Sequence, residues 1–360
     1  MNITFINRMM GIKFGGGEKF DLNMARALKK RGHKIRFVVG REWNQLSLPM
    51  DENEFEVVYI KTPYLRDIHY KVKPTNIIKK VISVAALAFD RLLFQIATYQ
   101  YLRNDNWTDI YQLCGQPQLG AKLSKKVVVW WPGPPSKKIL KYLKQCNATF
   151  AHGNTMIKLN EMIPTALNIE PAVDLTLFQY RKEKISEKVK FVFLGRLIPV
   201  KRIDFLIKAF NEAYKINTNI QLNIIGEGTE KENLENYIDS DINFIGPKYG
   251  IDLNKELINS DVFCITSEYE SFSIVVLEAM ASSLPIIATN VGYLPNLVTN
   301  NGLLVELDNV EQLKNAILDL ANDKDKRVKM GLEGRKRVEN EFSWDKSAEQ
   351  LEILYGELIK

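Results

Sequence analysis

Short apolar runs alternate with amphipathic stretches along the whole chain. In the first half, runs rich in β-branched and aromatic residues lie at 3–7, 34–39, 55–60, 108–113, 126–131 and 148–153. In the second half, similar runs lie at 189–195, 221–226, 242–246, 261–266 and 285–289. Near-continuous apolar strands separated by helices, such as the amphipathic stretch 18–32, are typical of parallel sheets covered on both faces. The pattern therefore predicts an α/β protein with two doubly wound domains.

The join between the two domains is expected in the charged stretch "YRKEKISEKVK", residues 180–190. A chain of 360 residues is long enough for two domains of ordinary size, each with its own core. We therefore expect a first domain over residues 1–180 and a second that begins at residue 181.

Charge is distributed unevenly between the two halves. Residues 1–180 contain 26 Lys and Arg against 14 Asp and Glu, a net charge of +12, whereas residues 181–360 contain 23 against 29, a net charge of −6. A basic first half suggests an anionic partner, such as a phosphate-bearing substrate, an acidic lipid surface or nucleic acid. Nucleic acid is not expected, because no recognition motif accompanies the charge.

Neither a membrane span nor a metal site is indicated by the sequence. No apolar run is long enough to cross a bilayer and the N-terminus does not resemble a signal peptide, so we expect a cytoplasmic protein. The three cysteines and three histidines lack the spacing of disulfide frameworks or metal sites, and the acidic triplets 239–241 and 323–325 are interpreted as solvated turns. No metal and no cofactor are expected.

Candidate chemistry lies where strands end, because ligands of such sheets bind at the carboxyl ends of the strands. After the first strand come Gly15, Gly16 and Gly17, followed by a helix that begins near Glu18. Backbone N–H groups of such glycines can approach an anion at the positive end of a helix. Alternatively, this cluster is a plain flexible turn, since it is not a G-x-G-x-x-G motif.

The corresponding loop of the second half is "LGRLIPVKR", residues 194–202. Arg196 and Lys201 follow a strand end and can converge on one diphosphate, Arg196 as a planar fork and Lys201 as a point charge. The alternative is that both are solvated surface cations.

Two glutamates flank an apolar run in "SEYESFSIVVLEAM", residues 267–280. Glu270 is expected in a loop at a strand end, and Glu278 is expected inside the helix that follows, with Ser271 or Ser273 as its N-cap. A carboxylate among Leu277, Ala279 and Met280 is costly to bury unless it accepts hydrogen bonds. The paired hydroxyls of a ribose would supply such donors.

In their order along the chain, these motifs resemble the retaining, nucleotide-sugar-dependent glycosyltransferases of family 4 (glycosyl transferases group 1), which have the GT-B fold. The resemblance covers nearly the whole chain, from "GGGEKFDLNMARALKKRGHKI" through "FLGRLIPVKRIDFLIKAF", "IIGEGTEKENLENYI" and "FIGPKYG" to "SEYESFSIVVLEAMASSLPIIATNVG". It implies two Rossmann-like domains: an acceptor-binding one and, over 181–342, a nucleotide-sugar-binding one. It also implies that the last stretch, 343–360, crosses back to the first domain.

The resemblance also implies roles for single residues. Arg196 and Lys201 would neutralise the donor diphosphate, and Glu278 would hold the ribose hydroxyls. Glu270, with the backbone of Ser271, Phe272 and Ser273, would orient the donor sugar. Gly15, Gly16 and Gly17 would close over the phosphates. The donor would be a nucleotide sugar and no metal would be needed.

One position departs from the family pattern. Many members have a histidine after the strand that corresponds to "KVVVWW", where this chain has Trp130 and Trp131. The segment "WWPGPP" is either a platform on which a sugar stacks or a rigid packed loop. His152 belongs to the next strand end and is interpreted as a loop histidine with a structural role.

The segment 70–104 combines four lysines, Lys71, Lys73, Lys79 and Lys80, with a long apolar helix that contains Asp90 and Arg91. This helix either covers the first sheet or lies on a membrane surface with acidic lipids. The second alternative would place the protein at the inner face of the membrane and would suit a lipid-linked acceptor.

The sequence thus predicts a retaining, metal-independent glycosyltransferase, a hexosyltransferase, that acts on a glycan or lipid-linked acceptor. A catalytically silent nucleotide-sugar-binding subunit, an epimerase and a sugar phosphorylase of the same fold stay open as alternatives.

Overall fold

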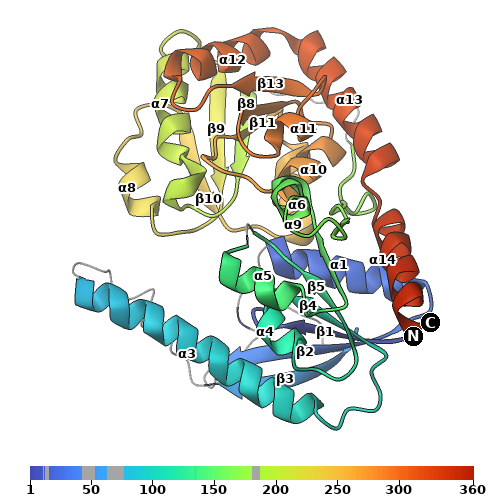
Figure 1. Ribbon diagram of the computed structural model, residues 1–360. Coiled ribbons are helices and arrows are strands. Elements are labelled where there is room, and N and C mark those ends of the chain that lie inside the picture. The colour runs from blue at the N-terminus through green and yellow to red at the C-terminus, as the bar shows by residue number, and fades with distance from the viewer. Residues whose placement is uncertain (11, 13–15, 43–52, 63–76, 134, 181–186) are drawn as a thin grey trace. The chain divides into compact units, whose positions relative to one another are not determined.

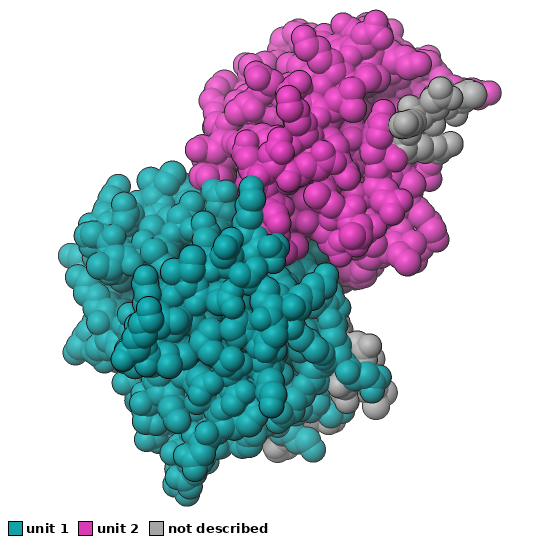
Figure 2. All heavy atoms as spheres, turned by 90° about the vertical axis from the view of Figure 1, so that its right-hand side faces the viewer, with its two compact units in different colours: residues 1–170, 345–360 teal, residues 171–344 magenta. Residues whose placement is uncertain are grey.

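The computed structural model describes all residues except 11, 13–15, 43–52, 63–76, 134 and 181–186. It divides into two compact units, one formed by residues 1–170 with 345–360 and the other by residues 171–344 (Figure 2). The first join lies about ten residues before the expected boundary at 180. The reason is that Ala172, Val173 and Phe178 are buried in the core of unit 2, where Val173 N donates to Phe342 O (3.4 Å).

Unit 1 contains, within the described residues, a seven-stranded parallel sheet in the order β3-β2-β1-β4-β5-β6-β7 (Figure 1). Its strands are β1 (Asn2–Asn7), β2 (Lys34–Glu42), β3 (Glu56–Thr62), β4 (Ile110–Cys114), β5 (Lys126–Trp130), β6 (Ala148–Ala151) and β7 (Leu167–Asn168). Its helices are α1 (Gly16–Lys30), α3 (Ile77–Leu102), α4 (Pro117–Gly120), α5 (Lys137–Leu143), α6 (Gly153–Asn160) and α14 (Trp344–Ile359). The six strands expected in the first half are confirmed, and the two-residue strand β7 is additional.

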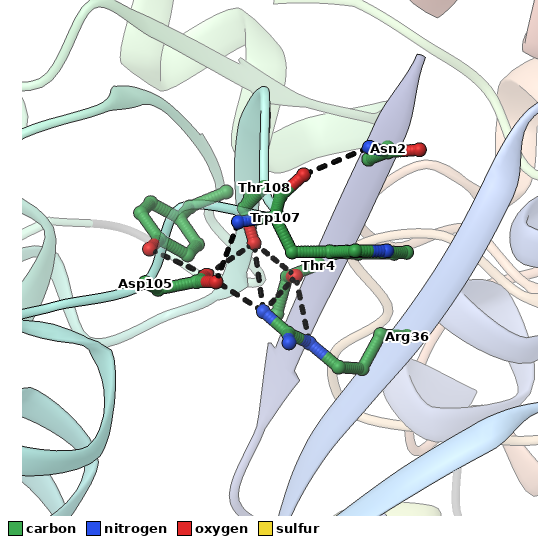
Figure 3. Close-up of polar contacts among 7 residues, drawn as sticks. Asn2, Thr4, Arg36, Asp105, Trp107 and Thr108 are labelled. Carbon is green, nitrogen blue, oxygen red and sulfur yellow. Dashed lines mark hydrogen bonds and ion pairs between the residues drawn. The ribbon is translucent and has the colours of Figure 1, made fainter.

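A buried polar cluster closes the amino-terminal edge of this sheet (Figure 3). Arg36 of β2 donates to Asp105 Oδ2 (2.6 Å) and to the hydroxyls of Thr4 and Thr108, and its guanidinium lies 4.5 Å from the ring centroid of Trp107. The arginine is therefore satisfied by protein groups, as a buried cation must be. The cluster holds the connection before β4 onto the sheet, at the edge opposite the strand ends where the candidate site residues lie.

Unit 2 contains, in the part of the chain described, a six-stranded parallel sheet in the order β10-β9-β8-β11-β12-β13. Its strands are β8 (Val189–Leu194), β9 (Ile220–Ile225), β10 (Ile242–Gly246), β11 (Val262–Ile265), β12 (Ile286–Thr289) and β13 (Gly302–Val305). Its helices are the 3₁₀-helix η1 (Pro199–Lys201), α7 (Ile203–Tyr214), α8 (Lys231–Glu235), α9 (Gly250–Ile258), α10 (Ile274–Ala281), α11 (Leu294–Leu297), α12 (Val310–Asn322) and α13 (Lys324–Glu341).

Alternate residues of the unit 2 strands enter two different cores. Phe191 and Phe193 of β8 pack with α7 and α12, whereas Val192 between them packs with α9, α10 and α13. Successive side chains of a strand point to opposite faces, so both faces of the sheet are covered by helices. The predicted doubly wound α/β fold is therefore confirmed.

Helix α14 belongs to unit 1 although it follows unit 2 in the sequence. Glu352 accepts hydrogen bonds from Arg31 Nε (2.7 Å) and contacts His33 Nε2 (3.0 Å). On the buried side of the helix, Tyr355 donates its hydroxyl to Gln112 Oε1 of β4. The expected return of the C-terminal helix to the first domain is confirmed, with α14 beginning at Trp344.

Candidate active site

The loop that carries Arg196 and Lys201 is held by backbone hydrogen bonds to the loop after β9. Gly195 N donates to Ile225 O (3.0 Å), and Leu197 N donates to Glu227 O (2.8 Å). The two backbones approach so closely that a Cβ on Gly226 would lie 1.9 Å from Gly195 O. Gly226 also has a φ of 145°, which disfavours other residues. This packing fixes the start of the cation-bearing loop.

Arg196 and Lys201 lie in different surroundings. Arg196 is exposed, and within the part of the chain described its guanidinium makes no ion pair. Lys201 ends η1, and its side chain is 18% exposed. Its Nζ lies 2.5 Å from Glu270 Oε1, so the structure joins two predicted site residues that are 69 positions apart in the sequence.

Glu270 is held at both its side chain and its backbone. Ser267 donates its hydroxyl to Glu270 Oε1 (2.8 Å), and Tyr293 N donates to Glu270 O (3.0 Å). Gly292 has a φ of 56°, and a Cβ on it would lie 2.0 Å from Glu270 O. Ser267 is itself fixed because Thr289 donates to its carbonyl oxygen (2.7 Å). The carboxylate is therefore pre-positioned, which a group that orients a ligand requires.

Helix α10 starts directly after this loop. Its N-cap residue is Ser273, so the prediction of Ser271 or Ser273 at this position is confirmed, although the Ser273 side chain makes no capping hydrogen bond. The first backbone N–H groups of a helix have no partner within the helix, and they carry its partial positive charge. The start of α10 thus offers donors for an anion, four residues after Glu270.

The side chain of Phe272 packs against Tyr293. The two rings stack with centroids 5.4 Å apart and an interplanar angle of 27°, and Phe342 contacts Phe272 edge-on. Phe272 thus joins the segment 270–273 to the loop before α11. This contact helps to fix the backbone between Glu270 and α10.

Glu278 is the fifth residue of α10 and is 1% exposed. Its neighbours Leu277, Ala279 and Met280 are fully buried in the core of unit 2. The predicted placement of Glu278 inside the helix and of Glu270 in the preceding loop is confirmed. The start of α10 lies between the two carboxylates along the chain.

In unit 1, the predicted glycine loop is partly described. Gly15 lies outside the described residues, whereas Gly16 and Gly17 are the first two residues of α1. A Cβ on Gly17 would lie 3.1 Å from the ring of Trp130 and 3.8 Å from Cys114 Sγ. Gly17 therefore has a packing reason to be glycine, besides any role in binding an anion.

Trp130 is a core residue and not a surface for a sugar. It is 2% exposed and stacks on Phe20 (4.8 Å) and His152 (5.4 Å). Its indole Nε1 donates to His152 Nδ1 (3.3 Å), so the proton of the neutral imidazole resides on Nε2. Burial lowers the pKa of His152 to about 3. Trp131 packs partly buried against the core of unit 1, so the packed-loop interpretation of this tryptophan pair holds.

A family model described as "Glycosyl transferases group 1" matches residues 177–337, which cover the loop of Arg196 and Lys201, Glu270 and Glu278. The chain therefore contains a glycosyl transferases group 1 domain. Most of unit 2 belongs to this domain.

A curated relative of the group 1 domain is the GDP-mannose-dependent monoacylated alpha-(1-6)-phosphatidylinositol monomannoside mannosyltransferase of Corynebacterium glutamicum. It is 33% identical over 168 residues, or 44% of each chain. The chain spans about half the length of the first curated relatives that it matches.

Solved structures resemble nearly the whole chain. The sucrose-phosphate synthase of Thermosynechococcus elongatus has a TM-score of 0.80 at 17% identity, covering 99% of this chain and 98% of that one. The Anabaena protein HepE, solved with UDP and glucose, has a TM-score of 0.77 at 16% identity, covering 99% and 100%. At such identity the likeness shows the fold, and it confirms the predicted GT-B arrangement of two Rossmann-like domains with a C-terminal helix.

Several residues that build the group 1 site were missed from the sequence. They are the backbone and side-chain supports of Glu270 and of the cation-bearing loop, namely Ser267, Thr289, Gly292, Tyr293, Gly226 and Gly228. The two glycines of "IIGEG" directly after a strand are a signal of close backbone approach. They could have indicated the backbone contact between this loop and the loop of Arg196 and Lys201. Ser267 carries no such signal, because it is an ordinary serine in a loop.

The acidic triplets of unit 2 have structural partners. Asp241 accepts from Lys188 (2.8 Å) and Gln221 (3.1 Å), and Asp323 caps α13 by accepting from Lys326 N (2.9 Å). Among the described residues, no group of three or more His, Cys, Asp or Glu is arranged to hold a metal ion.

Proposed function

We propose that the protein is a retaining glycosyltransferase that moves a hexose from a nucleotide-sugar donor to a glycan or lipid-linked acceptor without a metal. The observation that carries the proposal is the Lys201–Glu270 pair at the carboxyl ends of β8 and β11, where Lys201 shares its loop with Arg196. In doubly wound sheets this edge is where ligands bind. The match to the group 1 family, over residues 177–337, covers Arg196, Lys201, Glu270 and Glu278 and supports the proposal.

Two cations and a helix start suit the charge that develops in such a reaction. Breaking the anomeric C–O bond leaves negative charge on the departing nucleoside diphosphate and positive charge on the sugar ring. Arg196, Lys201 and the N–H groups at the start of α10 would stabilise the leaving diphosphate. Because Lys201 and the start of α10 are held before the reaction starts, they favour the transition state over the bound donor.

The two carboxylates would bind different parts of the donor. Glu270, held by Ser267 and Lys201, would accept hydrogen bonds from sugar hydroxyls, together with the backbone of Ser271, Phe272 and Ser273. Glu278 is buried inside α10 and would accept from the two ribose hydroxyls, which would satisfy a carboxylate that is costly to bury. The backbone N–H groups of Gly15, Gly16 and Gly17 would also bind the phosphates.

The acceptor side of the proposal rests on the charge of the first half and on relatives. The mannosyltransferase of C. glutamicum acts, by its name, on a phosphatidylinositol mannoside. A lipid-linked acceptor would bring a cytoplasmic enzyme to the inner face of a membrane as a peripheral protein.

The first test is thermal stabilisation of the wild type and Glu278→Ala by a panel of nucleoside diphosphates and their sugars, with and without EDTA. We expect one nucleotide to raise the melting temperature of the wild type in both conditions and that of Glu278→Ala much less, because the ribose loses its acceptor. Glu268→Ala is the matched control, since Glu268 is an exposed glutamate of the same loop. If no nucleotide stabilises the wild type, the donor site is not functional in this chain, and a silent subunit becomes the better interpretation.

A further inference from the structure

Helix α3 buries two polar side chains, those of Asp90 and Thr98, and exposes several large apolar ones. Its buried positions recur every fourth residue, at Ala86, Asp90, Phe94, Thr98 and Leu102. Asp90 is 3% exposed, and its buried charge is compensated by an ion pair with Arg8, which is also buried. A helix that only covers a sheet normally turns its apolar side chains towards the sheet and its polar ones towards water. Helix α3 differs because it also carries apolar side chains on its exposed side.

That second surface, here called the outer face, consists of large aliphatic and aromatic side chains that are 45–62% exposed: Val81, Ile82, Val84, Phe89, Leu92 and Ile96. With about 100° between successive helical residues, these positions cover an arc of roughly 160°. Tyr99 and Tyr101 follow at the C-terminal end of the helix and are also exposed. Figure 1 shows α3 as a long helix whose N-terminal end projects past the strands of unit 1. A continuous exposed apolar face of this size marks an interaction surface.

The positive charge on α3 and in the sequence before it indicates an anionic partner for the outer face. Among the described side chains of α3, Arg91 is exposed and charged, while the acidic residue, Asp90, is buried. The sequence from 61 to 80 that leads into the outer face contains Lys61, Arg66, Lys71, Lys73, Lys79 and Lys80 against one acidic residue, Asp67. A broad apolar face preceded by a cluster of cations matches a bilayer with acidic headgroups.

We propose that the outer face of α3 docks on an anionic lipid bilayer, with its apolar side chains at the boundary of headgroups and acyl chains. The helix lies on the membrane and does not cross it, since no helix among the described residues is long and apolar enough to span one. The exposed Tyr99, which lies on the same side of the helix as the outer face, suits the headgroup layer. The inference deepens the proposed function by naming the surface that brings the enzyme to a lipid-linked acceptor.

A second copy of the chain is a less suitable occupant of the outer face. When two helices pair side by side, each buries only a narrow strip of the other. The rest of an apolar face that spans roughly 160° would stay exposed to water.

The experiment is co-sedimentation of the full chain with vesicles of phosphatidylcholine alone and of phosphatidylcholine with phosphatidylglycerol, at low and high salt. The test variant is the double substitution Phe89→Glu with Leu92→Glu, and the control is Ile216→Glu, which replaces an apolar residue of unit 2 that is 65% exposed. We expect binding to the anionic vesicles only, with a partition coefficient at least ~100-fold lower for the double variant and unchanged for the control. Since Phe89 and Leu92 are exposed, the double variant should melt at the wild-type temperature.

Two outcomes would overturn the proposal. One is that the wild type does not bind anionic vesicles at low salt, or that the double variant binds as well as the wild type. The other is a concentration-dependent dimer in sedimentation velocity that the double variant abolishes, which assigns the outer face to a second copy. The increase in melting temperature caused by nucleotides is measured on the same samples without vesicles. It tests the proposed donor site separately, so loss of membrane binding and loss of donor binding can be told apart.

Discussion

The ion pair between Lys201 and Glu270 balances the charge of the candidate site before any ligand binds. Both side chains are mostly buried, so neither would be stable there without an opposite charge or hydrogen-bond partner. A donor diphosphate would bring a second anion to Lys201, and the exposed Arg196 would share its charge. The pair therefore links the residue proposed to orient the sugar to a residue proposed to stabilise the leaving group.

Removing either cation should reduce turnover far more than donor binding. We expect Arg196→Ala and Lys201→Ala to lower kcat by at least ~100-fold, because each removes a positive charge that would stabilise the negative charge developing on the leaving diphosphate. Steady-state kinetics with the nucleotide sugar found in the thermal panel would measure this. Arg202→Ala is the control, since this neighbouring arginine already pairs with Asp308 and should leave kcat nearly unchanged. Turnover near the wild-type value in Arg196→Ala or Lys201→Ala would contradict the mechanism.

Asp21 of α1 offers a pH test of the buried interior of unit 1. It is 1% exposed and accepts a hydrogen bond from Asn7 (2.8 Å), and burial raises its pKa from 3.8 to about 8. Between these two pH values the folded state holds a proton that the unfolded chain has released, so stability contributed by Asp21 falls as the pH rises. Asp21→Asn removes this loss without changing the shape of the side chain.

We therefore expect the melting temperature of Asp21→Asn to rise relative to the wild type by roughly 5 °C or more from pH 4 to pH 8. Thermal unfolding followed across this pH range measures the difference, which should be smallest at pH 4. A constant difference at all pH values would show that Asp21 has the same pKa in the folded and unfolded states.

At the scale of elements, close contact between two loops positions the cations of unit 2. The loops after β8 and β9 are joined by backbone hydrogen bonds, and the glycines of "GEG" allow the approach. Gly228 repeats the arrangement of Gly226, since its Cβ would lie 2.1 Å from Leu197 O. The site therefore depends on backbone contacts between elements as much as on its charged side chains.

Gly226→Ala should destabilise the protein by more than ~3 kcal/mol, because the new methyl group would overlap the carbonyl of Gly195 at an unfavourable φ. Gly356→Ala is the matched control. Gly356 lies in α14 with nothing within 4 Å of its would-be Cβ, so alanine there should stabilise by ~0.5–1 kcal/mol. Denaturant unfolding of both variants measures the two opposite signs. Equal stability of Gly226→Ala and the wild type would mean that the two loops can separate at little cost.

On the scale of the whole molecule, two units with similar sheets carry different surfaces. The first half of the sequence has a net charge of +12 and contains the exposed outer face of α3, whereas the second half has a net charge of −6 and contains the group 1 domain. This division suits a protein in which one unit meets an anionic surface and the other holds the donor. Helix α14 makes the last residues of the chain part of the same unit as the first ones.

The sequence by itself determined the elements and the fold class, because these depend on local patterns. Eleven strands were predicted from runs of apolar residues, and in the structure each run contains or overlaps a strand. The placement of Glu270 in a loop and Glu278 in a helix was equally readable, since a strand, a turn and an apolar helix follow one another within 22 residues.

Only the tertiary structure decided which residues meet. The Lys201–Glu270 pair, the support from Ser267 and the burial of Trp130 against Phe20 and His152 join positions whose spacing in the sequence carries no signal. The same holds for α3, where the sequence left two roles open and the structure shows a narrow buried stripe beside a broad exposed face. Side-chain contacts depend on how strands and helices pack in space, and local periodicity specifies the elements but not their partners.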